Sequence, residues 1–325
     1  MTVTRSAITG VGGYLPPTIV TNDDLSKFVD TSDAWITERT GIRSRRRAAP
    51  DLMTSDLAVE AAKQALARAG RTAGDIDLII VATTTPDLTF PATATIVQDK
   101  LGAPICIAFD VQAVCSGFVY ALAVADNFVA RGVSRCALVI GAETMTRLMD
   151  WDDRGTCVLF GDGAGAVVLE PLEGRGDSTD RGILGFSLRA DGSKKDLLFV
   201  DGGPSSTGTV GKLRMLGNQV FKHAVVNISE AVVSAARAAD VSLEDVDWFI
   251  PHQANQRILD GVAKRLGIPE DRVISTVAEH ANTSAASIPL ALAAGVEDGR
   301  VKAGHLLLME AMGGGLTWGA VVARL

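Results

Sequence analysis

The sequence has few aromatic residues, few cysteines and no long hydrophobic run. Phe, Trp and Tyr make up 5% of its 325 residues, and there are four Cys. The cysteines form no Cys-x-x-Cys pair, so they indicate neither a zinc site nor a disulfide framework, and we expect a reducing, cytoplasmic location. No apolar run approaches the roughly 18 residues of a membrane span, and residues 1–13 lack the charged-then-apolar order of a signal peptide. We therefore expect neither export nor membrane insertion.

The sequence also lacks an excess of basic charge. Its 31 Lys and Arg are outnumbered by 38 Asp and Glu, which gives a net charge of −7 and argues against nucleic acid as a partner. It has no Gly-x-Ser-x-Gly motif and no pair of histidines at metal-ligand spacing, so no metal site is expected. The glycine-rich segment 161–165 runs into an apolar stretch rather than a helix, which excludes a phosphate-binding loop.

The chain instead resembles itself. Hydrophobic residues make up 47% of it, and Ala-rich helical patterns alternate with short apolar runs, which is typical of the α/β class. Four segments of the first part match four of the second part in the same order: 58–80 with 231–250, 91–102 with 255–267, 132–143 with 299–310, and 163–170 with 318–325. The sequence predicts two similar α/β halves, 1–172 and 173–325, with a site where they meet.

Cys115 is the first candidate for that site. It lies between the apolar run 105–109, which we take for a buried strand, and residues 118–128, whose apolar positions have helical spacing. A thiol at a helix N-terminus faces unpaired N–H groups and the positive end of the helix dipole, which lower its pKa. We therefore predict that Cys115 is a nucleophile. The alternative is that it is a small buried apolar residue.

The second half has polar groups in corresponding loops. His252 follows the apolar run 248–250, and Asn282 follows the strand-like run 273–277. An imidazole can exchange protons, and an amide can donate a hydrogen bond without titrating. Gly313–Gly315 could present backbone N–H groups to a developing oxyanion. A buried core histidine and a tight turn are the structural alternatives.

Aromatic and basic residues suggest a ligand-binding face near the N-terminus. Trp35 and Arg154 could hold a flat ring between them, and Arg39 could meet a phosphate. For Arg45–Arg47 we expect a solvated surface, because runs of charge usually lie there.

Taken together, these segments resemble the β-ketoacyl-acyl carrier protein synthase III family. The resemblance is carried by Cys115 in AVCSGF, His252 in PHQAN, Asn282 in HANTSAASIP and the segment GGGLTWG. It extends over nearly the whole chain through DTSDAW, RTGIR, RGT, FGDGAG and GNQVFK. It implies a thiolase-like fold of duplicated halves in five layers, α-β-α-β-α, working as a homodimer.

The resemblance also implies a reaction. The Cys115 thiolate would attack an acyl-CoA and release CoA; malonyl-acyl carrier protein would then lose carbon dioxide, and its enolate would attack the acyl-cysteine. His252 and Asn282 would stabilise the enolate, and the backbone N–H groups of Cys115 and Gly314 would form the oxyanion hole. Acyl-CoA and malonyl-acyl carrier protein are substrates, and no cofactor is implied.

Further residues are implied by the same resemblance. The residues implied to bind CoA and its pantetheine arm are Trp35, Arg39, Arg154, Asn218, Phe221, Ala254 and Asn255. The residues implied to line the acyl pocket are Met312 and, from the partner subunit, Phe90. The residues implied to form a basic patch that meets an acidic carrier protein are Lys222, Arg257, Lys264 and Arg265. Met312 stands where many relatives have Phe, so the length and branching of the primer stay open.

Several alternatives compete with this interpretation. A degradative thiolase would need a second cysteine near the C-terminal glycines, where MEAMGGGLTWG has none, and elongating synthases usually have His where Asn282 stands. Chalcone-type synthases generally have longer chains. A relative in secondary metabolism, with an unusual primer or acceptor, stays open, and a silent acyl-CoA-binding protein would not need all three polar groups.

Overall fold

Two mixed β-sheets form the centre of the molecule, which a computed structural model describes for residues 2–325. In the first sheet β4 is parallel to β5 and β6, and β7 and β1 continue the sheet in antiparallel pairing. Its strands in spatial order are β1 (Val3–Tyr14), β7 (Asp162–Gly174), β6 (Ala137–Thr144), β4 (Leu78–Ala82) and β5 (Ile107–Val111).

The second sheet repeats this pattern with four strands. β11 is parallel to β12, and β13 and β8 follow in antiparallel pairing. Its strands in spatial order are β11 (Trp248–Pro251), β12 (Leu306–Gly313), β13 (Thr317–Arg324) and β8 (Gly182–Ala190). The counterpart of β5 is reduced to one parallel bridge between Phe249 and Val273.

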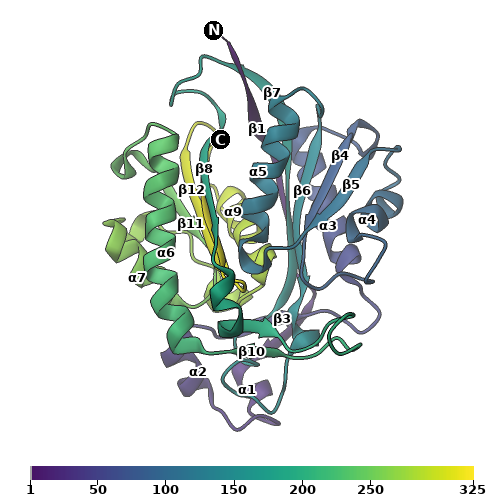
Figure 1. Cartoon of the computed structure of the whole chain (residues 1–325), viewed down its shortest axis with the longest axis vertical. Coiled ribbons are helices and arrows are strands. Elements are labelled where there is room, and N and C mark those ends of the chain that lie inside the picture. Colours follow the sequence, from purple (N-terminus) through teal and green to yellow (C-terminus); the bar gives the residue numbers. More distant parts are fainter. Residues whose placement is uncertain (1) are drawn as a thin grey trace.

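Helices cover both sheets on both faces and complete five layers (Figure 1). On the outer face of the first sheet lie α3 (Thr54–Ala69) and α4 (Thr93–Leu101); between the sheets lie α5 (Gly117–Ala130) and α9 (Ser287–Glu297); on the outer face of the second lie α6 (Gly217–Ala238) and α7 (Gln256–Leu266). The predicted duplicated α-β-α-β-α fold is thereby confirmed.

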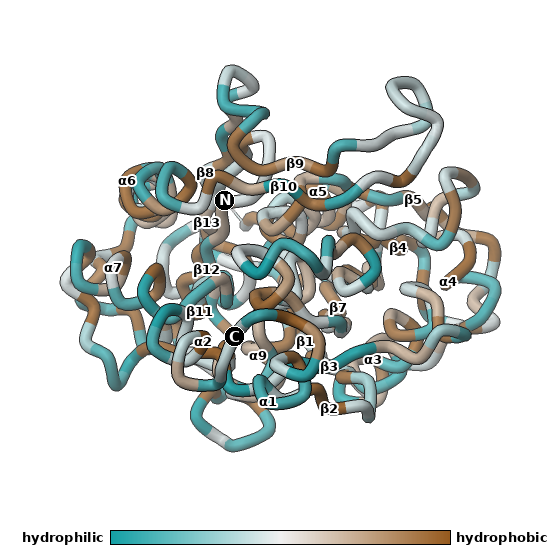
Figure 2. Tube along the Cα trace, turned by 90° about the horizontal axis from the view of Figure 1, so that it is seen from below, coloured by the Kyte–Doolittle hydropathy of each residue, from teal (hydrophilic) through white to brown (hydrophobic). Residues whose placement is uncertain are grey.

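Side-chain composition explains which helix takes which layer. α5 and α9 are apolar on nearly every side, with Phe118, Leu122 and Leu292 fully buried, so they fit only between two sheets. α6 and α7 have one apolar and one polar face, as outer helices do. Figure 2 shows the same distribution, with apolar segments in the middle of the molecule and polar ones on the outer loops and helices.

Short elements connect the main layers. They are β2 (Thr18–Thr21), α1 (Asn22–Leu25), α2 (Asp33–Thr40), β3 (Ser44–Arg47), β9 (Leu198–Val200), β10 (Leu213–Met215) and α8 (Val277–His280). α2 contacts α7, and β3 contacts α8. A segment of the first half thus reaches across to the second.

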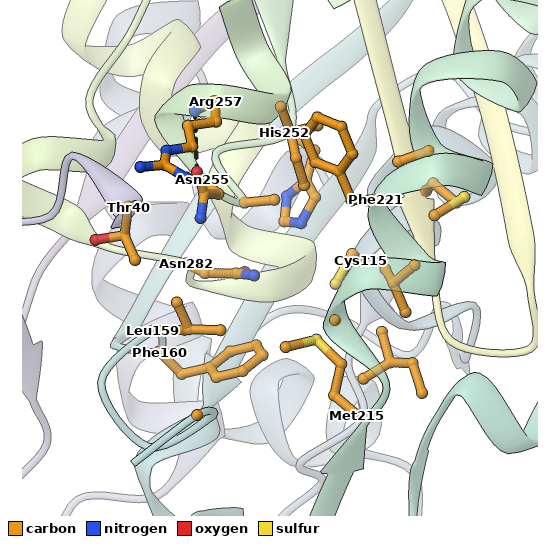
Figure 3. Close-up of a pocket in the computed structure, with 18 of the residues that line it drawn as sticks. Thr40, Cys115, Leu159, Phe160, Met215, Phe221, His252, Asn255, Arg257 and Asn282 are labelled. Atoms are coloured by element: carbon orange, nitrogen blue, oxygen red, sulfur yellow. Dashed lines mark hydrogen bonds between the residues drawn. The ribbon is translucent and has the colours of Figure 1, made fainter. Parts of the chain in front are cut away.

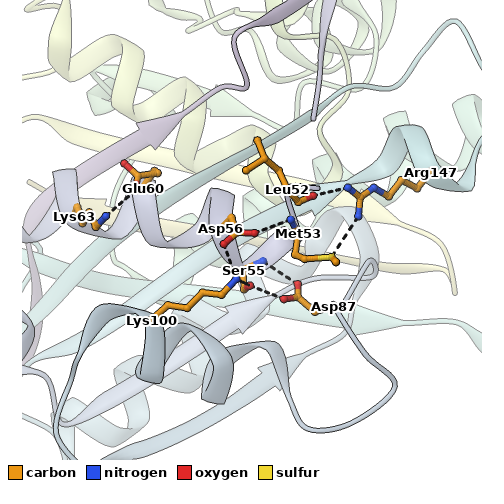
Figure 4. Close-up of polar contacts among 9 residues, drawn as sticks. All are labelled: Leu52, Met53, Ser55, Asp56, Glu60, Lys63, Asp87, Lys100 and Arg147. Atoms are coloured by element: carbon orange, nitrogen blue, oxygen red, sulfur yellow. Dashed lines mark hydrogen bonds and ion pairs between the residues drawn. The ribbon is translucent and has the colours of Figure 1, made fainter. Parts of the chain in front are cut away.

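Polar side chains fasten the outer helices of the first sheet to the loop after β4 (Figure 4). Asp87 accepts hydrogen bonds from the Ser55 backbone and hydroxyl at 2.9 and 2.5 Å. Lys100 of α4 donates to the same hydroxyl at 2.7 Å and pairs with Asp56. The start of α3, the end of α4 and the loop that carries Phe90 therefore form one cross-linked corner.

Four details of the sequence prediction need correction. The segment 105–109 is not a buried strand: β5 is an edge strand, and Ile105 before it is fully exposed. Residues 273–277 form only the Val273 bridge before α8 begins at Val277. Ala137 pairs with Leu78 in the first sheet, and Leu307 pairs with Trp248, the counterpart of Leu78, in the second. Ala137 therefore corresponds to Leu307, and the predicted match of 132–143 with 299–310 is three residues out of register.

The fourth correction concerns Arg45, which is 2% exposed and not on a solvated surface. Its guanidinium donates to the Asn22 side chain at 2.8 Å and to the carbonyls of Val20 and Val158.

The division into halves at residue 172 stays a prediction; β7 runs through Gly174. Within residues 2–325, no helix is both long and apolar enough to span a bilayer.

Candidate active site

One cavity of about 510 Å³ contains the three residues on which the sequence prediction rests. Cys115, His252 and Asn282 all contribute to its wall, although 137 positions separate the first two in the sequence. Figure 3 shows the His252 ring and the Asn282 amide directed toward the side of the cavity where Cys115 lies. The structure therefore brings these side chains together, as the matched halves predict.

Cys115 stands in a 3₁₀ turn (Val114–Ser116) that leads directly into α5. Val114 has φ of +50°, a conformation that branched residues rarely adopt. The Ser116 hydroxyl fixes the turn through contacts of 2.7 Å with the Ala113 carbonyl and 2.8 Å with Thr317 Oγ1. The turn thus holds the thiol at the start of α5, as predicted.

The predicted lowering of the Cys115 pKa is wrong. Burial raises the pKa of this thiol to about 12, and the nearby Glu143 carboxylate adds to the rise, whereas a hydrogen bond from Ser284 opposes it. The cost of desolvating a thiolate therefore exceeds the effect of the helix N-terminus. The free protein holds Cys115 as a thiol at neutral pH, so the thiol needs a base when it reacts.

His252 is held at the end of β11 by contacts on several sides. Its backbone N–H donates to the Glu310 carbonyl at 2.8 Å, and its Nδ1 lies 2.6 Å from Ser287 Oγ. The buried Gln253 side chain fixes the turn by donating to Pro251 and Ile274 carbonyls. Burial lowers the pKa of His252 to about 3, so the imidazole is neutral at pH 7. Because Nδ1 contacts Ser287, Nε2 is the ring nitrogen that remains for the cavity.

Asn282 is fixed by its backbone and by one side of its amide. Its N–H donates to the Leu159 carbonyl at 2.9 Å, and its carbonyl accepts from Gly161 N–H at 3.0 Å. Its Oδ1 accepts from the Ser284 N–H at 2.8 Å. The amide nitrogen is therefore the group that remains for the cavity, and Figure 3 shows it on the side facing Cys115. Asn282 can donate a hydrogen bond there.

The C-terminal glycines lie beside the nucleophile. A Cβ on Gly313 would stand 2.6 Å from the Cys115 nitrogen, so only glycine permits this approach. Met312 lines the cavity, and Gly314 begins the turn between β12 and β13. The part of Gly314 in an oxyanion hole stays a prediction.

An aromatic and cationic group marks one end of the cavity. The Arg39 guanidinium lies 4.6 Å and that of Arg154 lies 5.2 Å from the centre of the Trp35 ring. Arg154 also pairs with Asp30 at 3.1 Å, and it lies next to the cavity-lining Gly155 without lining the cavity itself. The other predicted contact residues of the cavity wall are Asn218, Phe221, Ala254, Asn255 and Arg257.

The remaining predicted residues lie outside the cavity. Phe90 is 82% exposed on the loop after β4. Lys222 is exposed on α6, and Lys264 and Arg265 are exposed in the last turn of α7. Any contact of these residues with a partner stays a prediction.

Two buried carboxyl groups near the site were missed from the sequence. Burial raises the pKa of Glu310, in the cavity wall, to about 8, so it is protonated at neutral pH. Burial raises the pKa of Glu143 to about 6, although hydroxyls of Thr85 and Ser284 donate to it at 2.5 and 3.1 Å. Each is a charged residue in an otherwise apolar strand pattern, LVIGAE for Glu143 and LLLMEAM for Glu310. That interruption was the sequence signal that could have found them.

Comparison with known proteins identifies the family. The chain is 78% identical over 321 residues to a β-ketoacyl-[acyl-carrier-protein] synthase III of Caulobacter vibrioides, which covers 99% of this chain and 100% of the relative. This chain belongs to the β-ketoacyl-acyl carrier protein synthase III family. Family models agree: that of 3-oxoacyl-[acyl-carrier-protein] synthase III matches residues 109–192, and that of its C-terminal part matches residues 236–325.

Solved structures of a synthase III and of a priming β-ketosynthase have the same fold. The synthase III of Aquifex aeolicus is 48% identical, with a TM-score of 0.92 over 98% of this chain and 100% of that one. The priming β-ketosynthase of the R1128 polyketide biosynthetic pathway is 37% identical, with a TM-score of 0.92 over 98% of this chain and 96% of that one. As a member of the synthase III family, the chain is a condensing acyltransferase.

The buried thiol of Cys115 predicts a steep pH dependence of its alkylation. Because the pKa of Cys115 is raised to about 12, its thiolate fraction grows about tenfold per pH unit from pH 7 to 10. Alkylation of Cys115 by iodoacetamide, followed by peptide mass spectrometry, should rise accordingly, with Cys115→Ala as the blank. A plateau reached by pH 8 would show that the helix N-terminus outweighs burial.

Proposed function

We propose that this chain starts fatty acid synthesis by condensing an acyl-CoA primer with malonyl-acyl carrier protein, with Cys115 as the carrier of the acyl group. The products are a β-ketoacyl-acyl carrier protein, CoA and carbon dioxide. The observation that carries the proposal is the meeting of Cys115, His252 and Asn282 in one cavity. Each residue supplies a group that the two half-reactions need.

In the first half-reaction the Cys115 sulfur bonds to the acyl carbon and the bond to the CoA sulfur breaks. The thiol must lose its proton for this, and the neutral imidazole of His252 is the base that the cavity offers. The proton passes from Cys115 to Nε2 and then to the leaving CoA thiolate. No cofactor enters this step.

In the second half-reaction the malonyl group loses carbon dioxide, and its thioester oxygen becomes an enolate. His252 Nε2–H and the Asn282 amide donate hydrogen bonds to this oxygen. The enolate carbon then attacks the acyl carbon on Cys115, and the thiolate that leaves is protonated from solvent. The backbone N–H groups of Cys115 and Gly314 stabilise the tetrahedral oxyanion in both half-reactions.

The two substrates reach Cys115 by the same route. Trp35, between the guanidinium groups of Arg39 and Arg154, forms a seat for the CoA adenine and phosphates. Asn218, Phe221, Ala254 and Asn255 line the path of the pantetheine arm. The basic patch of Lys222, Arg257, Lys264 and Arg265 on α6 and α7 guides the acidic carrier protein, although the whole chain is negative.

The working unit is a homodimer joined along β5. This edge strand has no partner on its outer side within residues 2–325, and the apolar residues at or near it are unusually exposed. Ile105 is 102%, Phe90 82% and Leu88 55% exposed. Pairing of two β5 strands would cover these side chains and carry Phe90 toward the acyl pocket of the other subunit.

Charge placed on β5 should separate the subunits. The double variant Ile105→Glu/Ile107→Glu sets like charges along the proposed joint, so it should sediment near the monomer mass of 34.0 kDa. Sedimentation equilibrium should give twice that mass for the unmodified protein and for the control Val233→Glu, which changes an exposed residue of the outer helix α6. A monomeric unmodified protein would refute the proposed dimer.

A second candidate is the priming of a secondary pathway with an unusual acyl group. The 37% identity to the R1128 priming β-ketosynthase favours it, and so does the flexible Met312 in the cavity wall. Both candidates use the same acyl transfer to Cys115, so they differ in the primer or in the acceptor. Acyl-CoA primers of graded length and branching, tested with malonyl-acyl carrier protein, decide between them.

The proposed acyl transfer is visible by intact-protein mass spectrometry. After incubation with acetyl-CoA, the protein should gain one acetyl group, which is lost on addition of malonyl-acyl carrier protein as product forms. Cys115→Ala should gain none, whereas Cys157→Ala, which removes a buried cysteine outside the cavity wall, should still be acetylated. Acetylation that persists in Cys115→Ala would contradict the assignment.

A further inference from the structure

Ser287 contacts the ring nitrogen of His252 that faces away from the cavity. It is the first residue of α9 and is 1% exposed, and its Oγ lies 2.6 Å from His252 Nδ1. The same oxygen accepts the backbone N–H of Gln253 at 3.4 Å. Within residues 2–325 the hydroxyl has no other hydrogen-bond partner. In the part of the chain that the structure describes, no other hydrogen bond reaches the His252 ring, so Ser287 alone holds Nδ1.

A hydroxyl can serve either tautomer of the imidazole. It has one hydrogen and two lone pairs. With one lone pair occupied by Gln253 N–H, Ser287 Oγ can accept a hydrogen bond from Nδ1–H or, after rotation about its C–O bond, donate one to bare Nδ1. A backbone carbonyl or a carboxylate at this place would hold the proton on Nδ1, and a backbone N–H would hold it on Nε2.

The two half-reactions need opposite states of His252. In acylation Nε2 must be bare to take the thiol proton of Cys115, so in that step the ring carries its proton on Nδ1 and donates it to Ser287. In condensation Nε2 must carry a hydrogen to meet the enolate oxygen, so Nδ1 accepts the Ser287 hydroxyl. Solvent supplies the exchange of protons between these states after CoA has left.

We propose that Ser287 is a positioning residue that holds His252 in both tautomers, so that one imidazole acts as base toward Cys115 and as hydrogen-bond donor to the enolate. The proposal rests on the proposed function of the site. It assigns Ser287 no contact with the substrate. Its effect reaches the reacting atoms only through His252.

Ser287→Ala removes the hydroxyl, and both half-reactions should slow. We expect acetylation of Cys115 and release of carbon dioxide from malonyl-acyl carrier protein to fall by about tenfold to a hundredfold each. The reason is that the rate factor contributed by a general acid or base requires a correctly oriented ring. Ser287→Thr keeps a hydroxyl and should recover most of both rates. Ser229→Ala is the control, since it removes a buried helical hydroxyl that bonds only to the Val225 carbonyl.

A direct measurement of the ring separates positioning from mere stability. With only four histidines in the chain, nitrogen-15 labelling of histidine gives a simple spectrum in which His252→Ala identifies the signal. Both tautomers of His252 should be populated in the wild type, and their ratio should change in Ser287→Ala. A wild-type ring held in one tautomer throughout the cycle would overturn the proposal, even if Ser287→Ala failed to fold.

Different results would refute the proposed function and the proposed role of Ser287. If the wild type gains no acetyl group from acyl-CoA, the proposed function is wrong whatever the variants do. If the wild type acetylates and condenses, but Ser287→Ala runs both half-reactions at the wild-type rate, only the role of Ser287 is refuted.

Discussion

The turns that precede α5 and α9 pack directly against each other, and the site depends on this contact. The turn before α9 also packs against β6, and the turn before α5 packs against β12. A Cβ on Gly141 of β6 would lie 2.2 Å from the Ala285 carbonyl, so glycine alone lets the second turn approach this closely. Cys115 stands in the first turn, and Asn282 lies two residues before the second, Ser284–Ala286. The duplicated fold thereby converts two similar turns into two different parts of one site.

The same packing removes water from the reacting groups. Burial raises the pKa of Cys115 to about 12 and lowers that of His252 to about 3, so both are neutral in the resting protein. A neutral thiol beside a neutral imidazole is stable until a substrate arrives. A neutral imidazole and an amide are also suitable donors for an enolate, because neither needs a counter-ion in the cavity.

Much of this arrangement could be predicted from the sequence. The matched segments gave the duplicated α/β halves, and the motifs around Cys115, His252 and Asn282 pointed to one site. The predictions that failed concern properties that tertiary packing decides. Whether β5 is an edge strand and whether Arg45 is buried depend on which distant segments pack beside them. The raised pKa of Cys115 follows from its burial, which its position at a helix start does not reveal.

Other features have no sequence pattern of their own. Ser287 is one of two serines in NTSAAS, and the 2.6 Å contact with His252 distinguishes it. Glu310 interrupts an apolar strand, but its place in the cavity wall depends on the pairing of β12 with β11. Side-chain direction in a strand changes with each residue, so a register error of three is enough to misplace it.

The central claim is that the first half carries the acyl group and the second stabilises the enolate. Asn282→Ala tests it most directly, because Asn282 takes part only in the second step. Acetylation of Cys115 should proceed at the wild-type rate, while release of carbon dioxide from malonyl-acyl carrier protein should fall by roughly a hundredfold or more, the usual cost of losing one oxyanion donor. Carbon dioxide release at the wild-type rate, or an equal loss of both steps, would contradict the account.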